Sequence, residues 1–261
     1  MIVGSSMTQR AYDLQHLGFG IGLSDWYSRL ADIYLRGQSG YNSRWTLASL
    51  QELIGPHKPD MAIIFLGNND SLTGKNGQCV PVEEFRENMI AIMRMFRTVN
   101  PHIVFLLLTP TVATKIGRID SVTEKYVHVV RELGSLDEHT AVVELWDGDN
   151  AVTKFDLCDT LHLNISGNNK VLCNIKAAIR LHFKEFVPFN DVNPTINHKE
   201  NDKENVDKQH SLSDGGKIVK QKNSDKVRRL KWLFPPWNQL AGKSLEESVQ
   251  VINSARTRSF L

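Results

Sequence analysis

The clearest strand in the sequence is Met61-Ala62-Ile63-Ile64-Phe65-Leu66, which stops at the polar stretch Gly67-Asn68-Asn69-Asp70. An uninterrupted apolar run of this length is typical of a strand covered on both faces, as in parallel sheets. In such sheets the chemistry lies outside the carboxyl ends of the strands. The run therefore predicts a buried parallel strand, and the polar residues after it are candidates for a functional site.

Further strands and helices alternate on both sides of this run. Strands are predicted over residues 1–3, 32–36, 103–108 and 141–145. Helices are predicted, from apolar residues at helical spacing, over residues 18–30, 43–54, 81–96, 122–133 and 165–183, with Ser43 as an N-cap. This alternation indicates βαβ units with right-handed crossovers. The sequence thus predicts an α/β fold, a three-layer flavodoxin-like domain with a five-stranded parallel sheet over residues 1–188. Because the first strand is short for a central one, further residues are expected to precede it in the natural protein.

Composition limits the classes of function. The chain has 261 residues, 41% of them hydrophobic, and a net charge of +2. This is enough for one α/β domain plus additional sequence, and the near-balanced charge indicates no nucleic-acid partner. The three cysteines, Cys79, Cys158 and Cys173, have no C-x-x-C spacing and suit a reducing compartment. With no signal peptide and no integral membrane segment in the sequence, we expect a soluble, cytoplasmic protein.

The composition changes after residue 188. Residues 189–231 are highly charged and are predicted to be a disordered linker. Residues 232–261 begin with the apolar run Trp232-Leu233-Phe234-Pro235-Pro236-Trp237 and contain a predicted short helix over residues 244–255. Two interpretations stay open: the segment docks back on the domain, or it contacts a protein or membrane surface. In the first case, the apolar run is a candidate cover for part of a cleft.

A carboxylate and an imidazole, Asp159 and His162, lie three residues apart just before the last predicted helix. In a tight loop the carboxylate can orient the ring as a general base. An isolated D-x-x-H is more often a surface turn. The pair gains weight because Ser5 and Ser6 follow the first strand and Asn69 follows the third, so all of them are expected at one sheet edge.

The chemistry of these groups is complementary. A serine hydroxyl is a poor nucleophile until a base takes its proton, which His162 can do. The backbone N–H of Gly40 and the amide of Asn69 are good donors to an oxyanion. The sequence contains no G-x-S-x-G elbow, which excludes an ordinary α/β-hydrolase.

Four blocks of the sequence resemble those of the SGNH (GDSL-type) hydrolases and occur in the family's order over about residues 1–185. They are Gly4-Ser5-Ser6-Met7-Thr8-Gln9, Arg36-Gly37-Gln38-Ser39-Gly40-Tyr41-Asn42-Ser43-Arg44-Trp45, Gly67-Asn68-Asn69-Asp70-Ser71 and Asp159-Thr160-Leu161-His162-Leu163. The second and third look most like the isoamyl acetate-hydrolysing esterase branch. The resemblance implies a lipase-like serine esterase that acts on short-chain carboxylic esters through an acyl-enzyme, without a metal or organic cofactor.

The resemblance also implies roles for individual residues. Ser6 is the nucleophile, His162 the base and Asp159 the orienting acid. The backbone N–H groups of Ser6 and Gly40, together with Asn69, form the oxyanion hole.

One residue departs from the family pattern, because Ser5 stands where the family has an aspartate. A serine can replace only some of the hydrogen bonds that hold the turn, and Ser5 also becomes a second candidate nucleophile. Asp156 is the alternative acid, and Asp70 is expected to brace the loop of Asn69.

Three other functions stay open. The Ser5 departure suggests a catalytically degenerate binding protein on the same fold. An acyltransferase would use the same site with an alcohol in place of water. A nucleotide or flavin binder is the least favoured, because the first strand is followed by neither a P-loop nor G-x-G-x-x-G.

Overall fold

The computed structural model of the chain describes residues 1–74, 77–115, 117–192 and 237–257. The chain divides into two compact units. The first contains residues 1–188 and the C-terminal segment, and the second begins at Phe189 with the short helix α7 (Phe189–Val192). Most of the predicted linker, residues 193–231, and the apolar run over residues 232–236 lie outside the described residues.

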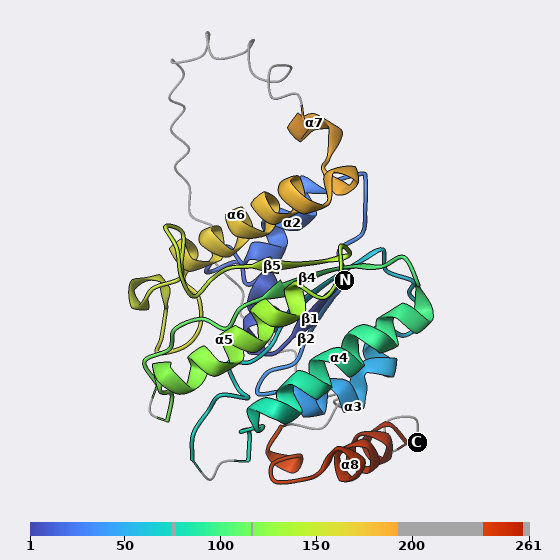
Figure 1. Ribbon diagram of the computed structural model, residues 1–261, viewed down its shortest axis with the longest axis vertical. Coiled ribbons are helices and arrows are strands. Elements are labelled where there is room, and N and C mark those ends of the chain that lie inside the picture. Colours follow the sequence, from blue (N-terminus) through green and yellow to red (C-terminus); the bar gives the residue numbers. More distant parts are fainter. Residues whose placement is uncertain (75–76, 116, 193–236, 258–261) are drawn as a thin grey trace, which may run out of the picture. The chain divides into compact units, whose positions relative to one another are not determined.

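Five strands form one parallel sheet in the first unit, in the order β2-β1-β3-β4-β5 (Figure 1). They are β1 (Ile2–Gly4), β2 (Leu35–Gly37), β3 (Met61–Phe65), β4 (Val104–Leu108) and β5 (Thr140–Val143). This arrangement confirms the predicted α/β fold. β1 lies between β2 and β3, with Gly4 in register with Gly37 and Phe65. The loops after these three strands therefore start side by side.

Helices cover both faces of the sheet (Figure 1). One face carries α3 (Ser43–Ile54), α4 (Val82–Val99) and α5 (Asp120–Gly134), and the other carries α2 (Phe19–Trp26) and α6 (Ile165–His182). Successive side chains of a strand point to opposite faces of the sheet, so alternate residues pack into the hydrophobic cores on its two faces. Thus Ile64 packs on the α3–α5 side, and Ile63 and Phe65 pack on the α2–α6 side.

Three details of the prediction are wrong. The helix predicted over residues 18–30 ends at Trp26, and turns follow it, with Arg29 at a φ of 68° that no α-helix contains. β2 begins at Leu35 rather than at residue 32, because its partner β1 is only three residues long and pairs with residues 35–37 alone. The N-cap of α3 is Asn42 rather than Ser43: Asn42 is extended, and its Oδ1 accepts a hydrogen bond from Trp45 N at 2.9 Å. The backbone N–H of Ser43 donates instead to Asp70 Oδ1, at 2.8 Å.

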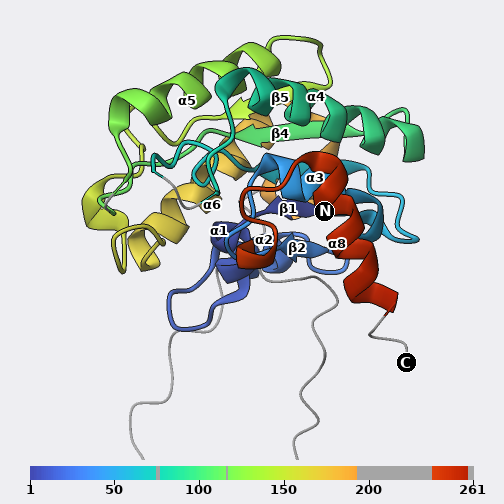
Figure 2. The same ribbon diagram turned by 90° about the horizontal axis from the view of Figure 1, so that it is seen from below.

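The described part of the C-terminal segment packs against α3 of the same unit (Figure 2). It consists of a short 3-10 turn (Trp237–Gln239) and α8 (Leu245–Thr257). Leu240 and Ile252 are fully buried and form a cluster with Tyr41 and Trp45. This contact agrees with the first of the two interpretations of the segment. Within the described ranges, no helix combines the length and the hydropathy of a membrane span.

Candidate active site

Ser6 is the first residue of the short helix α1 (Ser6–Gln9), which follows β1 after a tight turn at Ser5. Gly4, the last residue of β1, has no room for a side chain: a Cβ there would lie 2.4 Å from the carbonyl oxygen of Phe65 and 2.3 Å from Thr8 Oγ1. The glycine allows the backbone to turn in this narrow space. Because Ser6 is the first residue of a helix, its backbone N–H has no acceptor within the helix.

The Asp159–His162 loop brings the imidazole to Ser6. His162 Nε2 lies 2.9 Å from Ser6 Oγ, and His162 Nδ1 lies 2.6 Å from Asp159 Oδ2. Asp159 Oδ1 accepts the backbone N–H groups of Leu161 and His162, each at 2.7 Å, which fixes the carboxylate within its own loop. A carboxylate can only accept, so Nδ1 carries the proton and Nε2 faces the hydroxyl as an acceptor.

Electrostatics keep this pair in the charge states that a base needs. Partial burial acts to raise the pKa of Asp159, but hydrogen bonds from the His162 ring and the loop backbone hold that pKa at about 2. Burial lowers the pKa of His162, and Arg10 and Lys115 act in the same direction, against the opposing effect of Asp159. At neutral pH, therefore, an ionised carboxylate orients a neutral imidazole.

Two of the three predicted oxyanion donors, Gly40 and Asn69, follow β2 and β3. Gly40 has a φ of 79°, which glycine adopts freely, and its carbonyl accepts a hydrogen bond from Gln78 Nε2 at 2.7 Å. Asn69 is 4% exposed, and its Nδ2 donates to the carbonyl of Tyr41 at 2.7 Å. An amide nitrogen carries two protons, so a second N–H of Asn69 remains for another acceptor.

Asp70 connects the loop of Asn69 to α3. It is completely buried, and its carboxylate accepts the backbone N–H of Ser43 at 2.8 Å and that of Gly67 at 3.2 Å. Burial raises the pKa of Asp70 to about 6, against the opposing effect of these hydrogen bonds. The loop after β3 is thereby fixed to the first turn of α3.

Ser5 and Ser6 differ in their surroundings although both are buried. Ser5 makes no side-chain hydrogen bond that caps α1. The hydroxyl that meets His162 belongs to Ser6. The geometry therefore favours Ser6 over Ser5 as the nucleophile.

Asp156, the alternative acid, faces a different partner. Its Oδ2 accepts from Lys170 Nζ and from the backbone N–H and hydroxyl of Thr153, each at 2.8 Å. These contacts begin the 3-10 turn Lys154–Asp156 and connect it to α6. Asp156 is a structural residue of this loop, and Asp159 is the carboxylate at the imidazole.

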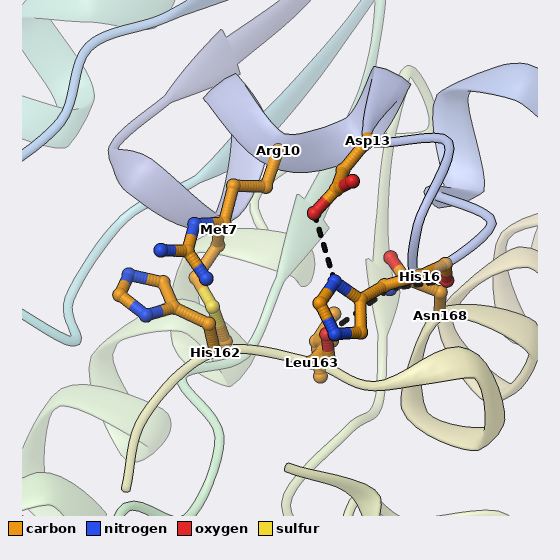
Figure 3. Close-up of a pocket in the computed structure, with 7 residues that line it drawn as sticks. All are labelled: Met7, Arg10, Asp13, His16, His162, Leu163 and Asn168. Atoms are coloured by element: carbon orange, nitrogen blue, oxygen red, sulfur yellow. Dashed lines mark hydrogen bonds and ion pairs between the residues drawn. The ribbon is translucent and has the colours of Figure 1, made fainter. Parts of the chain in front are cut away.

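A small hollow lies beside His162 (Figure 3). The guanidinium of Arg10 lies next to the imidazole, and Arg10 Nη1 is 3.7 Å from Asp159 Oδ2. A second Asp–His pair lines the same hollow, with Asp13 Oδ2 2.8 Å from His16 Nδ1. Asn168, in α6, donates from its Nδ2 to the carbonyl of His16 at 3.1 Å. The segment after Ser6 and the start of α6 are thus connected beneath the site.

One residue of the site was not found from the sequence. Arg118 Nη2 donates to Asn69 Oδ1 at 3.0 Å, although Arg118 lies in the long loop between β4 and α5. A single arginine in a polar loop has no motif that would indicate this contact. The cysteines Cys79, Cys158 and Cys173 are free, and no three His, Cys, Asp or Glu side chains of the described ranges cluster as metal ligands.

This arrangement has a definite chemical capacity. The Ser6 hydroxyl contacts a neutral imidazole, which an ionised carboxylate orients. Candidate N–H donors follow β2 and β3, the strands on either side of β1. Such a set can convert the hydroxyl into a nucleophile and stabilise negative charge that develops on a substrate oxygen.

Comparison with known proteins agrees with this capacity. Residues 2–170 match the GDSL-like Lipase/Acylhydrolase family. A GDSL esterase/lipase of Arabidopsis thaliana is 31% identical over 206 residues, which cover 69% of this chain and 84% of that protein. The isoamyl acetate-hydrolyzing esterase 1 homolog of Homo sapiens is 32% identical over 190 residues, which cover 64% of this chain and 75% of that protein.

Solved structures share the fold. An acetyl xylan esterase is similar with a TM-score of 0.56 and 18% identity, over 68% of this chain and 98% of that one. A possible lipase from Chitinophaga pinensis has a TM-score of 0.56 and 16% identity, over 69% of this chain and 96% of that one. The chain therefore belongs to the GDSL-like lipase/acylhydrolase family, the SGNH (GDSL-type) hydrolases predicted from its four sequence blocks, and this membership supports the hydrolysis of carboxylic esters.

Proposed function

We propose that the chain is a serine esterase that hydrolyses short-chain carboxylic esters through an acyl-enzyme formed on Ser6. The observation that carries the proposal is the pair of contacts from Ser6 Oγ to His162 Nε2 and from His162 Nδ1 to Asp159, at 2.9 and 2.6 Å. Relatives named for isoamyl acetate, a short-chain ester, support the substrate class. The cysteine pattern supports the cytoplasm as the compartment.

In the first half-reaction Ser6 Oγ attacks the carbonyl carbon of the ester while His162 Nε2 accepts the hydroxyl proton. The ionised Asp159 stabilises the imidazolium that forms. The oxyanion receives hydrogen bonds from the backbone N–H groups of Ser6 and Gly40 and from the second N–H of Asn69. The ester C–O bond then breaks, and the alcohol leaves with the proton from His162.

In the second half-reaction a water molecule replaces the alcohol. His162 takes a proton from the water as it attacks the acyl carbon, and the same donors hold the second oxyanion. The bond to Ser6 breaks, Ser6 Oγ regains the proton, and the carboxylic acid leaves. An acyltransferase would differ only here, since an alcohol would take the place of water.

The first experiment is to label the purified protein with a fluorophosphonate and map the adduct by mass spectrometry. We expect an adduct on Ser6 that is lost in Ser6→Ala and in His162→Ala. The matched control is Ser5→Ala, which lies one residue away and should retain the adduct. Hydrolysis of p-nitrophenyl acetate, butyrate and octanoate should then decrease with acyl length.

Other outcomes lead to different conclusions. An adduct on Ser5 would reassign the nucleophile. The absence of any adduct on well-folded protein would favour a catalytically degenerate binding protein. A product ester formed in the presence of added alcohol, in excess of hydrolysis, would identify an acyltransferase.

A further inference from the structure

A partly buried cation lies behind one of the proposed oxyanion donors. Arg118 Nη2 donates to Asn69 Oδ1 at 3.0 Å, on the opposite side of the amide from its bond to Tyr41. Burial lowers the pKa of Arg118 to about 10, while the negative charge of Asp70 acts in the opposite direction. Its Nε is also enclosed and has no hydrogen-bond partner among the described residues. Burying a charged guanidinium costs free energy. The buried position of Arg118 therefore suggests that its contact with Asn69 serves the function of the site.

Main-chain contacts fix the position of Arg118. The carbonyl of Gly117 accepts both the backbone N–H and the hydroxyl of Thr73, each at 2.7 Å. Gly117 has a φ of 84°, and a Cβ there would lie 2.8 Å from the carbonyl oxygen of Thr73, so this residue must be glycine. Arg118 N donates to Lys115 O at 3.1 Å, which closes a turn. The turn that carries Arg118 is therefore held against the loop that carries Asn69.

The two partners of Asn69 allow only one orientation of its amide. An arginine can only donate and a backbone carbonyl can only accept. The amide oxygen must therefore face Arg118, and the amide nitrogen must face Tyr41. A rotation of the amide by 180° would break both bonds and would turn oxygen lone pairs toward the developing oxyanion.

We propose that Arg118 is a positioning residue of the oxyanion hole, which holds the amide of Asn69 with its second N–H available to the substrate oxygen. The inference rests on the proposed function. The positive charge also polarises the amide through the shared hydrogen bond, which strengthens the N–H as a donor. Because an oxyanion exists only in the transition state and the tetrahedral intermediate, losing this support lowers kcat far more than it raises KM.

The test is Arg118→Met, which keeps a long side chain but has no donor. We expect kcat on p-nitrophenyl acetate to decrease about 10- to 100-fold, less than the loss of about 10²–10³ for a missing oxyanion donor, because Asn69 itself remains. KM should change by less than about threefold. Arg118→Lys, which keeps a charged donor, should recover part of the loss. The matched control is the exposed Arg94, on α4, whose change to Met should leave kcat unaltered.

A double-mutant cycle separates positioning from general damage. If Arg118 acts through Asn69, Asn69→Ala combined with Arg118→Met should be as slow as Asn69→Ala alone. The inhibition constant of a trifluoromethyl ketone, which forms a tetrahedral adduct, should rise in Arg118→Met by the factor that kcat loses.

Two results overturn the inference. Losses that multiply in the double mutant would assign Arg118 a role independent of Asn69, and an unchanged kcat in both Arg118 variants would assign it none. In either case a wild-type protein that is labelled on Ser6 leaves the proposed function intact. An inactive, unlabelled wild type would reject the proposed function and this inference together.

Discussion

The His162 imidazole experiences opposing influences on its pKa. Burial and the positive charges of Arg10 and Lys115 lower the pKa, while the hydrogen bond and charge of Asp159 raise it, and the result lies below the ordinary value. A base with a lowered pKa stays unprotonated to lower pH. The proposed esterase should therefore remain active under mildly acidic conditions.

The pH dependence of kcat/KM tests this balance. Protonated His162 cannot accept the proton of Ser6, so activity falls as pH decreases through the pKa of the free enzyme. We expect the acidic midpoint below the ordinary histidine value of about 6.5. Lys115→Met removes one lowering influence and should move the midpoint upward, whereas Lys125→Met, at an exposed position of α5, should not move it. A wild-type midpoint above about 6.5 would contradict the assignment.

Asp159 and Asp156 should fail in different ways when each is changed to Asn. In Asp159→Asn the new amide could donate to Nδ1 and favour the wrong tautomer, so kcat should fall by about 10⁴, the size of effect known for a serine protease triad. Asp156→Asn removes the charge that Lys170 contacts at 2.8 Å and should lower the free energy of unfolding by about 2 kcal/mol. Steady-state kinetics and urea unfolding of both variants would measure the contrast. A large loss of kcat in folded Asp156→Asn would show that Asp156 is the acid after all.

Among the secondary-structure elements, the strands that are buried on both faces are the ones that the sequence predicts best. β3 and β4 are read from their apolar runs because both cores take alternate residues from them. β2 is an edge strand of intermediate burial, and its length depends on a partner that is distant in sequence. Asn42 and Ser43 can both cap a helix, and the choice is made by Asp70, which takes the N–H of Ser43.

The candidate site shows the same division. Ser6, Asp159 and His162 are found from local blocks, and the fold brings Ser6 and His162 together across 156 residues. Arg118 is not found, because its position depends on a bond between Gly117 and Thr73, which are 44 residues apart. Contacts of this kind follow from tertiary structure and leave no local pattern.

The docking of α8 can be tested at Ile252. Ile252→Ala removes fully buried methyl groups from the cluster with Tyr41 and Trp45, and such changes cost about 2–5 kcal/mol in a rigid core. In this protein the decrease in stability cannot exceed the free energy of docking of α8 on the domain, because the helix can detach before the domain unfolds. We expect faster proteolysis within residues 237–257 than in the wild type. The matched control is Gln250→Ala, at an exposed position of the same helix, and equal cleavage rates in both variants would contradict the docking.

For the molecule as a whole, the C-terminal segment is connected to the proposed site through residues 41–45. Leu240 and Ile252 cover Tyr41 and Trp45, and the carbonyl of Tyr41 holds the amide of Asn69. Arg44 adds a hydrogen bond to the carbonyl of Lys243 and an ion pair with Glu84. The hypothesis that residues 232–237 cover part of a cleft falls almost wholly outside the described residues and stays a prediction.

Removal of all residues after Pro188 tests both ideas. Exposing the cluster should lower the melting temperature, and a less firmly held Tyr41 carbonyl should lower kcat. A cover over the cleft would instead appear as a change in KM that depends on ester length. The substitution Ile252→Asp in the full chain serves as the comparison, since it should release α8 while every residue remains present. Unchanged stability and unchanged kinetics on several esters would reject both effects.

The sequence distance between Ser6 and His162 also matters while the chain is being made. Ribosomes deliver residues in order, and domains tend to fold as they emerge. Ser6 leaves the ribosome first, but β1 needs β3 beside it, and the Asp159–His162 loop follows the last strand of the sheet. A nascent chain therefore carries Ser6, the proposed nucleophile, without the proposed base until almost the whole domain has been translated. Fragments from interrupted translation would be inert toward cellular esters.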